Sequence, residues 1–179
     1  MSAVVIKGDT SGSISLTVPL VAGANTATLP AATGTVMVSG NMPAFSAYAS
    51  AAVTVTSATF TKVQINTKEF DTNSNFDNVT NYRFTPTVAG YYQVNAQLNI
   101  TSGNTRAIVL IYKNSSPAKV GNDIQASTPN GVNISCLIYM NGTTDYLEMY
   151  GYTTSGTTVQ FLGGTGSTTY FQAAMVRGA

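Results

Sequence analysis

The stretch that decides the fold runs from residue 134 to residue 152 and reads ISCLIYM, then NG, then TTDYLEMYGY. In the second run, apolar and polar residues alternate with the period of a β-strand, not of a helix. Asn141 and Gly142 lie between the two runs, and the Asn-Gly pair favours the two-residue type I′ turn of an antiparallel hairpin. The stretch therefore predicts a β-hairpin in which residues 134–140 pair with residues 143–152.

Similar strand-like runs continue along the chain. Short runs rich in Thr, Val, Ile, Tyr and Phe recur, and Gly, Asn, Ser or Pro separate them. None of these runs has the sustained 3.6-residue apolar period of a helix. We expect further strands at residues 58–66, 81–85, 91–100, 106–113, 132–140, 157–162 and 168–176. About eight to ten short strands with regularly spaced turns are typical of a sandwich or jelly roll, so the predicted fold class is all-β.

The first 42 residues differ from the rest. No aromatic residue precedes Phe45, and all 10 Tyr and 7 Phe lie from that residue onward. Short strand-like runs occur at residues 14–18 and 35–38, but their side chains are too small to build a core. We therefore expect residues 1–42 to be a short extended N-terminal β segment that lies along something else. Residues 43–179 are expected to form the globular domain.

The composition excludes several classes of function. Only 8% of residues are charged, and 8 Lys+Arg against 7 Asp+Glu give a net charge of +1, which argues against binding to nucleic acid or to an anionic membrane. The absence of histidine removes the usual general base and the usual zinc ligand. The single Cys136 excludes an intrachain disulfide and is interpreted as a small buried apolar residue. No apolar run is long enough for a transmembrane helix, and the first residues lack a signal-peptide pattern.

Residues 76–94 read FDNVTNYRFTPTVAGYYQV and resemble the C1q-like family. Phe84, Gly90 and Tyr92 match the family spacing, whereas the two following inward positions carry Val and Ala in place of aromatic residues. The Phe-Asp pair at the start of the stretch is one residue early. Gly90 is expected to allow a tight corner, and alternate residues from Tyr92 onward to point to one face of a strand. The resemblance implies a C1q/TNF-like jelly-roll β-sandwich that associates as a homotrimer.

A second resemblance concerns residues 12–36, which read GSISLTVPLVAGANTATLPAATGTV. This segment is similar to one that recurs in tail and fibre proteins of bacteriophages. The combination implies a virion protein, in a tail or capsid fibre, that is assembled in the host cytoplasm. Residues 1–42 would then attach to other virion proteins, and the C-terminal domain would face outward.

Alternation places Tyr146, Glu148, Tyr150 and Tyr152 on one strand face, away from the intervening Leu and Met. One interpretation is a carbohydrate-binding platform, in which the rings stack on sugars and the carboxylate accepts hydroxyl hydrogen bonds. The other interpretation is a trimer seam, in which Glu148 pairs with Arg or Lys of a neighbouring subunit.

Acidic residues raise two further possibilities. Asp123 and Asp145 are candidate ligands for calcium, because some C1q-like trimers carry loop aspartates near the threefold axis. Solvated loop acids are the alternative, and no other cofactor is expected. Carboxylate pairs such as Glu69 and Asp71 are the residue type used by glycosidases, but acidic residues are expected on any surface, so hydrolysis ranks last.

The leading hypothesis is therefore a non-enzymatic, homotrimeric structural protein of a phage virion whose head binds host cell-surface polysaccharide or another receptor. The alternative is a purely architectural decoration or connector protein of the virion. A soluble lectin of a cell is a third and weaker option.

Overall fold

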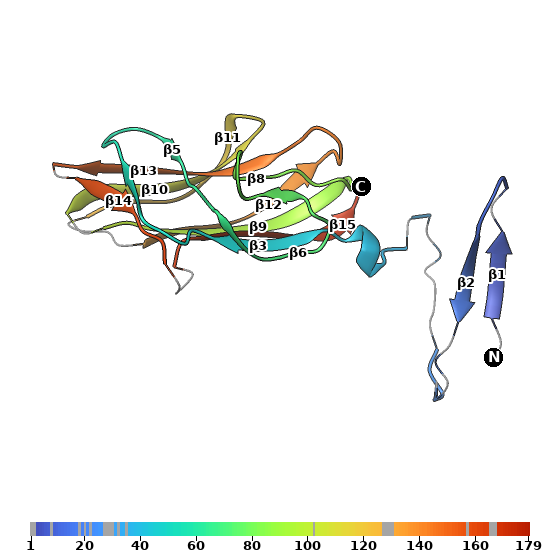
Figure 1. Ribbon diagram of the computed structural model, residues 1–179. Coiled ribbons are helices and arrows are strands. Elements are labelled where there is room, and N and C mark those ends of the chain that lie inside the picture. Colours follow the sequence, from blue (N-terminus) through green and yellow to red (C-terminus); the bar gives the residue numbers. More distant parts are fainter. Residues whose placement is uncertain are drawn as a thin grey trace. The chain divides into compact units, whose positions relative to one another are not determined.

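The computed structural model describes residues 3–7, 9–17, 19, 21, 23–26, 31, 33–34, 36–101, 103–126, 131–156, 158–164 and 168–179. The chain divides into two compact units, residues 1–34 and residues 35–179, and each is described by itself (Figure 1).

The first unit contains an antiparallel hairpin of β1 (Ala3–Lys7) and β2 (Ser13–Thr17). β2 coincides with most of the strand predicted at residues 14–18. The strand predicted at residues 35–38 is wrong for residues 36–38, which lie outside any strand, and Thr35 lies outside the described residues. A single 3₁₀ turn, η1 (Ser39–Asn41), follows in the second unit.

The second unit is a β-sandwich of two antiparallel sheets, which confirms the predicted all-β fold (Figure 1). The first sheet has the strand order β12 (Gly131–Met140), β9 (Gly90–Asn99), β15 (Tyr170–Gly178), β3 (Ala44–Tyr48) and β6 (Thr67–Asp71). The second has the order β11 (Ser116–Gln125), β10 (Asn104–Lys113), β13 (Leu147–Ser155), β8 (Arg83–Phe84) and β7 (Phe76–Asp77), with β5 (Thr61–Lys62) paired to β13. A small pair, β14 (Val159–Phe161) with β4 (Val53–Val55), accompanies them.

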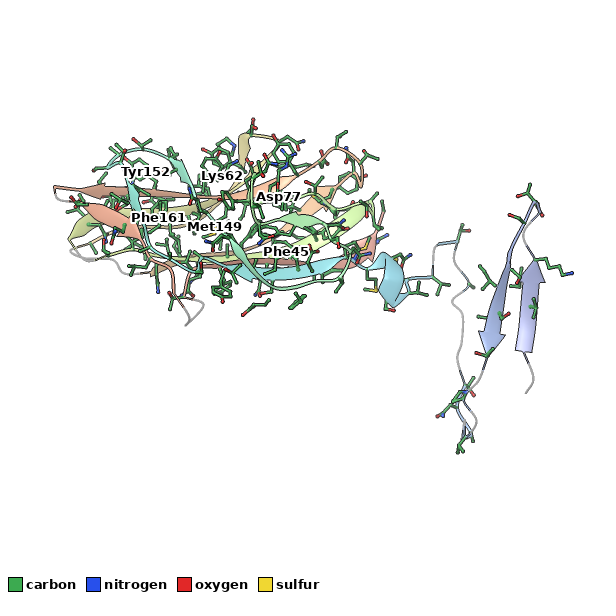
Figure 2. All side chains as sticks on the ribbon, viewed as in Figure 1. Phe45, Lys62, Asp77, Met149, Tyr152 and Phe161 are labelled. Carbon is green, nitrogen blue, oxygen red and sulfur yellow. The ribbon has the colours of Figure 1, made fainter. Side chains whose placement is uncertain are left out.

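The core lies between the two sheets. On β9 the alternate residues Tyr92, Val94, Ala96 and Leu98 are all buried, as their spacing predicts. Phe45 lies at the centre of an aromatic cluster, with ring centroids 4.5 Å from Phe76 and 4.6 Å from Phe84. Figure 2 labels Phe45, Met149 and Phe161, which belong to this core. Because large buried aromatic rings contribute much of the burial energy, this cluster joins β3, β7 and β8 across the sandwich.

Gly90 is needed for space. Its φ angle lies outside the left-handed region, so the backbone conformation at this position does not itself require glycine. A Cβ atom here would lie 2.3 Å from the carbonyl oxygen of Arg177 on the neighbouring strand β15. The next inward residue, Tyr92, donates its hydroxyl hydrogen to the carbonyl of Val88 at 2.7 Å, and burial raises the pKa of this hydroxyl to about 12.

The hairpin predicted across Asn141 and Gly142 is wrong, because β12 pairs with β9 and β13 pairs with β10 in the other sheet. The Asn141 side-chain oxygen accepts three backbone hydrogen bonds, each at 3.0 Å. The donors are the N–H groups of Thr143, Thr144 and Asp145. This local cap favours a turn that carries the chain from one sheet to the other. The two-residue turn with positive φ at both positions is Asn114–Ser115, at 53° and 65°, between β10 and β11.

Most other predicted strands are present within a few residues of their expected bounds. The strand predicted at residues 58–66 is present only as β5, and β1, β3, β4, β6, β7 and β11 were not predicted. No helix in the described part of the chain has the length and apolarity needed to cross a membrane.

Candidate functional site

The predicted ligand residues lie on the outer side of the sheet that contains β10 and β13. Leu147 and Met149 are fully buried in the core, so Glu148, Tyr150 and Tyr152 point to the opposite side of β13. We call Phe60, Tyr112, Tyr146, Glu148, Tyr150 and Tyr152 the tyrosine face. Of these, Phe60 and Tyr112 come from other segments and were not predicted.

Two ring pairs form the centre of the tyrosine face. Tyr150 stacks on Tyr112 of β10, with ring centroids 3.9 Å apart and planes inclined by 16°. Tyr152 packs against the exposed Phe60 with centroids 4.7 Å apart. Burial, together with the charge of Glu148, raises the pKa of the Tyr150 hydroxyl, so this hydroxyl remains a neutral donor and acceptor at pH 7.

Glu148 has its ionic partner within the chain. Its Oε1 atom lies 2.5 Å from Nζ of Lys62 on β5, and its side chain is only 4% exposed. The same Lys62 ammonium donates to the carbonyl of Asn81 at 3.3 Å. The expected pairing of Glu148 with a neighbouring subunit is therefore corrected to an internal ion pair. The ion pair between Lys62 and Glu148 holds β5, and with it the neighbouring Phe60, against β13.

Tyr146 is also occupied by internal contacts. The guanidinium of Arg83 lies 4.5 Å from its ring centroid, and its hydroxyl forms a hydrogen bond with Ser115 at 2.7 Å. Cation–π contact of this kind fixes the ring orientation. The rings of Tyr150, Tyr152 and Phe60 are therefore the members of the tyrosine face best placed to meet a ligand.

Asp123 and Asp145 lie apart, and each has a cation from this chain. Asp123 accepts two hydrogen bonds from Arg106, at 2.8 Å and 2.6 Å, and these lower its pKa. Asp145 lies 2.7 Å from Nζ of Lys113 and accepts from Asn114 at 2.8 Å. Burial opposes ionisation of Asp145, but its hydrogen bonds outweigh burial, so its pKa is lowered.

Metal ligands are not gathered in the part of the chain that the structure describes, where no three His, Cys, Asp or Glu residues meet. Cys136 lies on β12 opposite Val94, and burial raises the pKa of its thiol. The protonated thiol acts as a small apolar group, not as a nucleophile.

Glu69 accepts from the Ser46 hydroxyl at 2.6 Å, while Asp71 accepts backbone N–H bonds from Asn75 and Phe76.

The outer side of the other sheet was not singled out by the sequence. In register across it, Ser135, Asn95, Gln172 and Ser46 form one row on β12, β9, β15 and β3. The next row is Leu137, Gln93, Ala174 and Ala44. We call these two rows, together with Tyr91, Tyr139 and Val176, the amide face.

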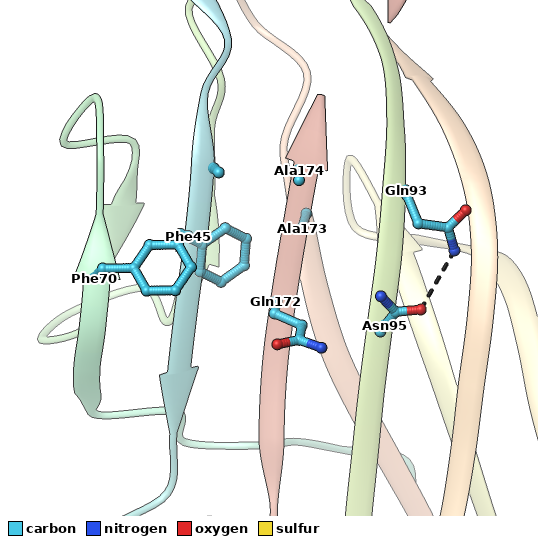
Figure 3. Close-up of a pocket in the computed structure, with 8 residues that line it drawn as sticks. Phe45, Phe70, Gln93, Asn95, Gln172, Ala173 and Ala174 are labelled. Carbon is cyan, nitrogen blue, oxygen red and sulfur yellow. Dashed lines mark hydrogen bonds between the residues drawn. The ribbon is translucent and has the colours of Figure 1, made fainter. Parts of the chain in front are cut away.

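The amide face contains a shallow depression of about 190 Å³ (Figure 3). Phe70 forms one wall, Phe45, Ala44, Ala173 and Ala174 supply apolar lining, and the amides of Gln93, Asn95 and Gln172 surround it. The Gln93 amide donates to Asn95 at 3.3 Å and to Ser135 at 3.0 Å. Among the described outer positions, β9, β3 and β15 up to its bulge near Val176 carry no charged side chain.

One end of the amide face is apolar. Tyr91, Leu137, Tyr139 and Val176 are between 40% and 54% exposed, and the rings of Tyr91 and Tyr139 lie 5.4 Å apart. Two cations border this end, because Arg177 lies opposite Tyr91 in register and Nζ of Lys113 lies 5.7 Å from the ring centroid of Tyr139. Exposed aromatic and aliphatic side chains that gather in this way are the surface type that protein interfaces bury.

The sequence matches no family model and no curated protein. The structure is similar to Eiger TNF from S. frugiperda, with a TM-score of 0.56 and 10% identity over 77% of this chain and 93% of that chain. It is similar to murine APRIL, with a TM-score of 0.58 and 6% identity over 75% and 99% of the two chains. It is also similar to the PRD1 vertex protein P5, with a TM-score of 0.51 and 17% identity over 77% and 98%. The second unit therefore has the jelly-roll β-sandwich fold of TNF-like proteins.

Proposed function

We propose that this chain is a non-enzymatic structural protein of a phage virion, that it assembles as a homotrimer, and that its jelly-roll domain binds a glycan on the host surface. The similarity of fold to a phage vertex protein, PRD1 P5, supports a place in the virion. In this proposal residues 1–42 join the domain to other virion proteins, and assembly takes place in the host cytoplasm.

The amide face carries the proposal of self-association. Its exposed tyrosines, Leu137 and Val176 would gain burial energy against a partner, and its amides offer hydrogen bonds without charge. The face has few charges of its own, because those of Glu69, Lys113 and Arg177 lie at its borders, and most soluble oligomers are closed assemblies of identical chains. A second copy of this chain is therefore the partner that the surface fits best.

The mass of the purified chain in solution tests self-association. We expect light scattering to give three times the chain mass of 18.6 kDa. Leu137→Glu places a charge within the amide face and should give single chains, because a buried unpaired charge is strongly unfavourable. Val79→Glu is the matched control, since Val79 is 74% exposed in a turn away from that face. Single chains in the unmodified protein, or an unchanged mass in Leu137→Glu, would count against the proposal.

The tyrosine face carries the proposal of glycan binding. The rings of Tyr150, Tyr152 and Phe60 offer apolar surfaces for sugar rings, with phenolic hydroxyls at their edges. Glu148 acts here as a positioning residue, because its ion pair with Lys62 holds the Phe60 segment in place. Tyr146 completes the edge of the platform through its contacts with Arg83 and Ser115. Three copies would multiply a weak affinity through avidity.

An array of bacterial surface polysaccharides tests glycan binding directly. We expect saturable binding of the unmodified chain to at least one polysaccharide, and about tenfold weaker binding for Tyr152→Ala if that ring is an anchor. Glu148→Gln should lower the melting temperature, because Glu148 is buried, and it should weaken binding less than Tyr152→Ala does. A trimer that binds no polysaccharide on the array would instead favour the architectural alternative, a decoration or connector protein.

A further inference from the structure

The β1–β2 hairpin has one apolar face. Val4 lies opposite Leu16 and Ile6 lies opposite Ile14 in the antiparallel register. Since directly paired residues point to the same side of a sheet, these four side chains share one face. They are between 57% and 67% exposed.

The opposite face of the hairpin is more polar. It carries Ser13, Ser15, Thr17 and Lys7, together with Val5. The only charged residue within the two strands, Lys7, is thus on the side away from the aliphatic cluster. An uncharged aliphatic face on a two-stranded sheet is a surface that needs a partner, because an isolated hairpin is marginally stable in water.

We propose that Val4, Ile6, Ile14 and Leu16 pack against the same four side chains of other copies of this chain. This inference rests on the homotrimer proposed above. It assigns residues 3–17 a role in joining the copies to one another, beyond attachment to other virion proteins.

The size of the face identifies the occupant. Four aliphatic side chains exposed to this extent present roughly 400 Å² of apolar surface, about half of the ~800 Å² that each partner buries in a standard stable interface. A separate protein that bound this face alone would therefore gain too little area. Copies already held together by their jelly-roll domains meet this requirement, because the covalent link gives the hairpins a high effective concentration.

Hydrogen exchange of the intact chain tests whether the face is covered. In the trimer we expect the strand amides of residues 3–17 to be protected, and Leu16→Asp to raise their exchange rates by about tenfold or more. Ser15→Asp is the matched control, because Ser15 is the preceding residue, lies on the other face and is also exposed to solvent. Equal exchange in the two variants would overturn the proposal, because the aliphatic face would then not be the contact.

Disulfide cross-linking tests whether the contact is between chains. In a Cys136→Ser background, Ile14→Cys should give covalently linked chains on a denaturing gel under mild oxidation, and Ser15→Cys should give far fewer. Mass in solution is recorded for the same samples. A trimer without Ile14→Cys cross-links overturns the hairpin contact and leaves the proposed function intact, whereas single chains overturn both.

Discussion

At the scale of single residues, Asp77 shows how one carboxylate positions a pair of core rings. It accepts backbone hydrogen bonds from Thr80 at 3.0 Å, from Val79 at 2.9 Å and from Asn81 at 3.1 Å. The bonds from Thr80 and Val79 are the main reason that the pKa of Asp77 lies well below its usual range. The turn that they close brings Phe76 of β7 opposite Phe84 of β8.

Asp77→Asn should therefore destabilise the domain at neutral pH. We expect a loss of about 1 kcal/mol, reduced by solvent screening, which corresponds to roughly 2–4 °C in melting temperature for a chain of this size. A carboxylate with a depressed folded pKa stabilises fully above its unfolded value of 3.8, and this stabilisation is lost as the pH falls below that value. The difference between the two melting temperatures should thus shrink steadily as the pH falls from 4 to 2. A difference that stays constant over this range would contradict the assignment.

The ion pairs of Asp123 and Asp145 lead to a second prediction at this scale. Because Arg106 and Lys113 already neutralise the two carboxylates, we expect complete chelation of divalent cations to leave the melting temperature and the oligomer mass unchanged. The comparison needs only thermal melting and light scattering with and without a chelator. A lower melting temperature that added calcium restores would support the calcium interpretation instead.

At the scale of elements, strands in which buried and exposed residues alternate along the whole length were predictable from the sequence. Strands that form only because they pair with an adjacent strand were not. β9, β12 and β15 bury every second residue over most of their lengths, so their patterns are visible in the sequence. β11 contains Pro117 and Gly121 and is largely exposed, so local propensity disfavours it. It is a strand because the Asn114–Ser115 turn sets it against β10 at the edge of the sheet.

The same distinction applies to the candidate site. Alternation along one strand placed Glu148, Tyr150 and Tyr152 on a common face. Lys62 and Phe60, which pair with Glu148 and Tyr152, lie about 90 residues earlier in the chain. Contacts over such a separation depend on the packing of β5 across β13, which no local pattern encodes.

The turn at Asn141 leads to a prediction at the element scale. The side-chain oxygen of Asn141 accepts three backbone hydrogen bonds, so Asn141→Ala leaves those donors without their partner. We expect a loss of about 1–2 kcal/mol in the free energy of unfolding, measured by denaturant titration. Thr143→Ala in the same turn is the control and should be close to neutral, because Thr143 contributes its backbone N–H to this network. Equal losses in the two variants would show that the cap is not what holds the turn.

At the scale of the whole molecule, the central issue is how a chain with 8% charged residues protects its apolar surface. The core of the sandwich accounts for the inward residues of both sheets, but the apolar end of the amide face and the aliphatic face of the hairpin remain exposed in a single chain. Both surfaces are uncharged over most of their area, and both belong to the same polypeptide chain. Association of identical chains, as proposed, would bury both at once, which is why the two proposals are coupled.

This coupling predicts a melting temperature that depends on protein concentration. If dissociation accompanies unfolding, mass action raises the melting temperature of a trimer as concentration rises. With an unfolding enthalpy of about 0.7 kcal/mol per residue, the expected increase is roughly 3 °C for each tenfold increase in concentration. Calorimetry over a hundredfold range of concentration would measure it. Leu137→Glu should abolish the dependence, whereas Val79→Glu should preserve it, because only Leu137 lies on the amide face. A concentration-independent melting temperature in the unmodified chain would mean that its apolar faces tolerate water and that association contributes nothing to its stability.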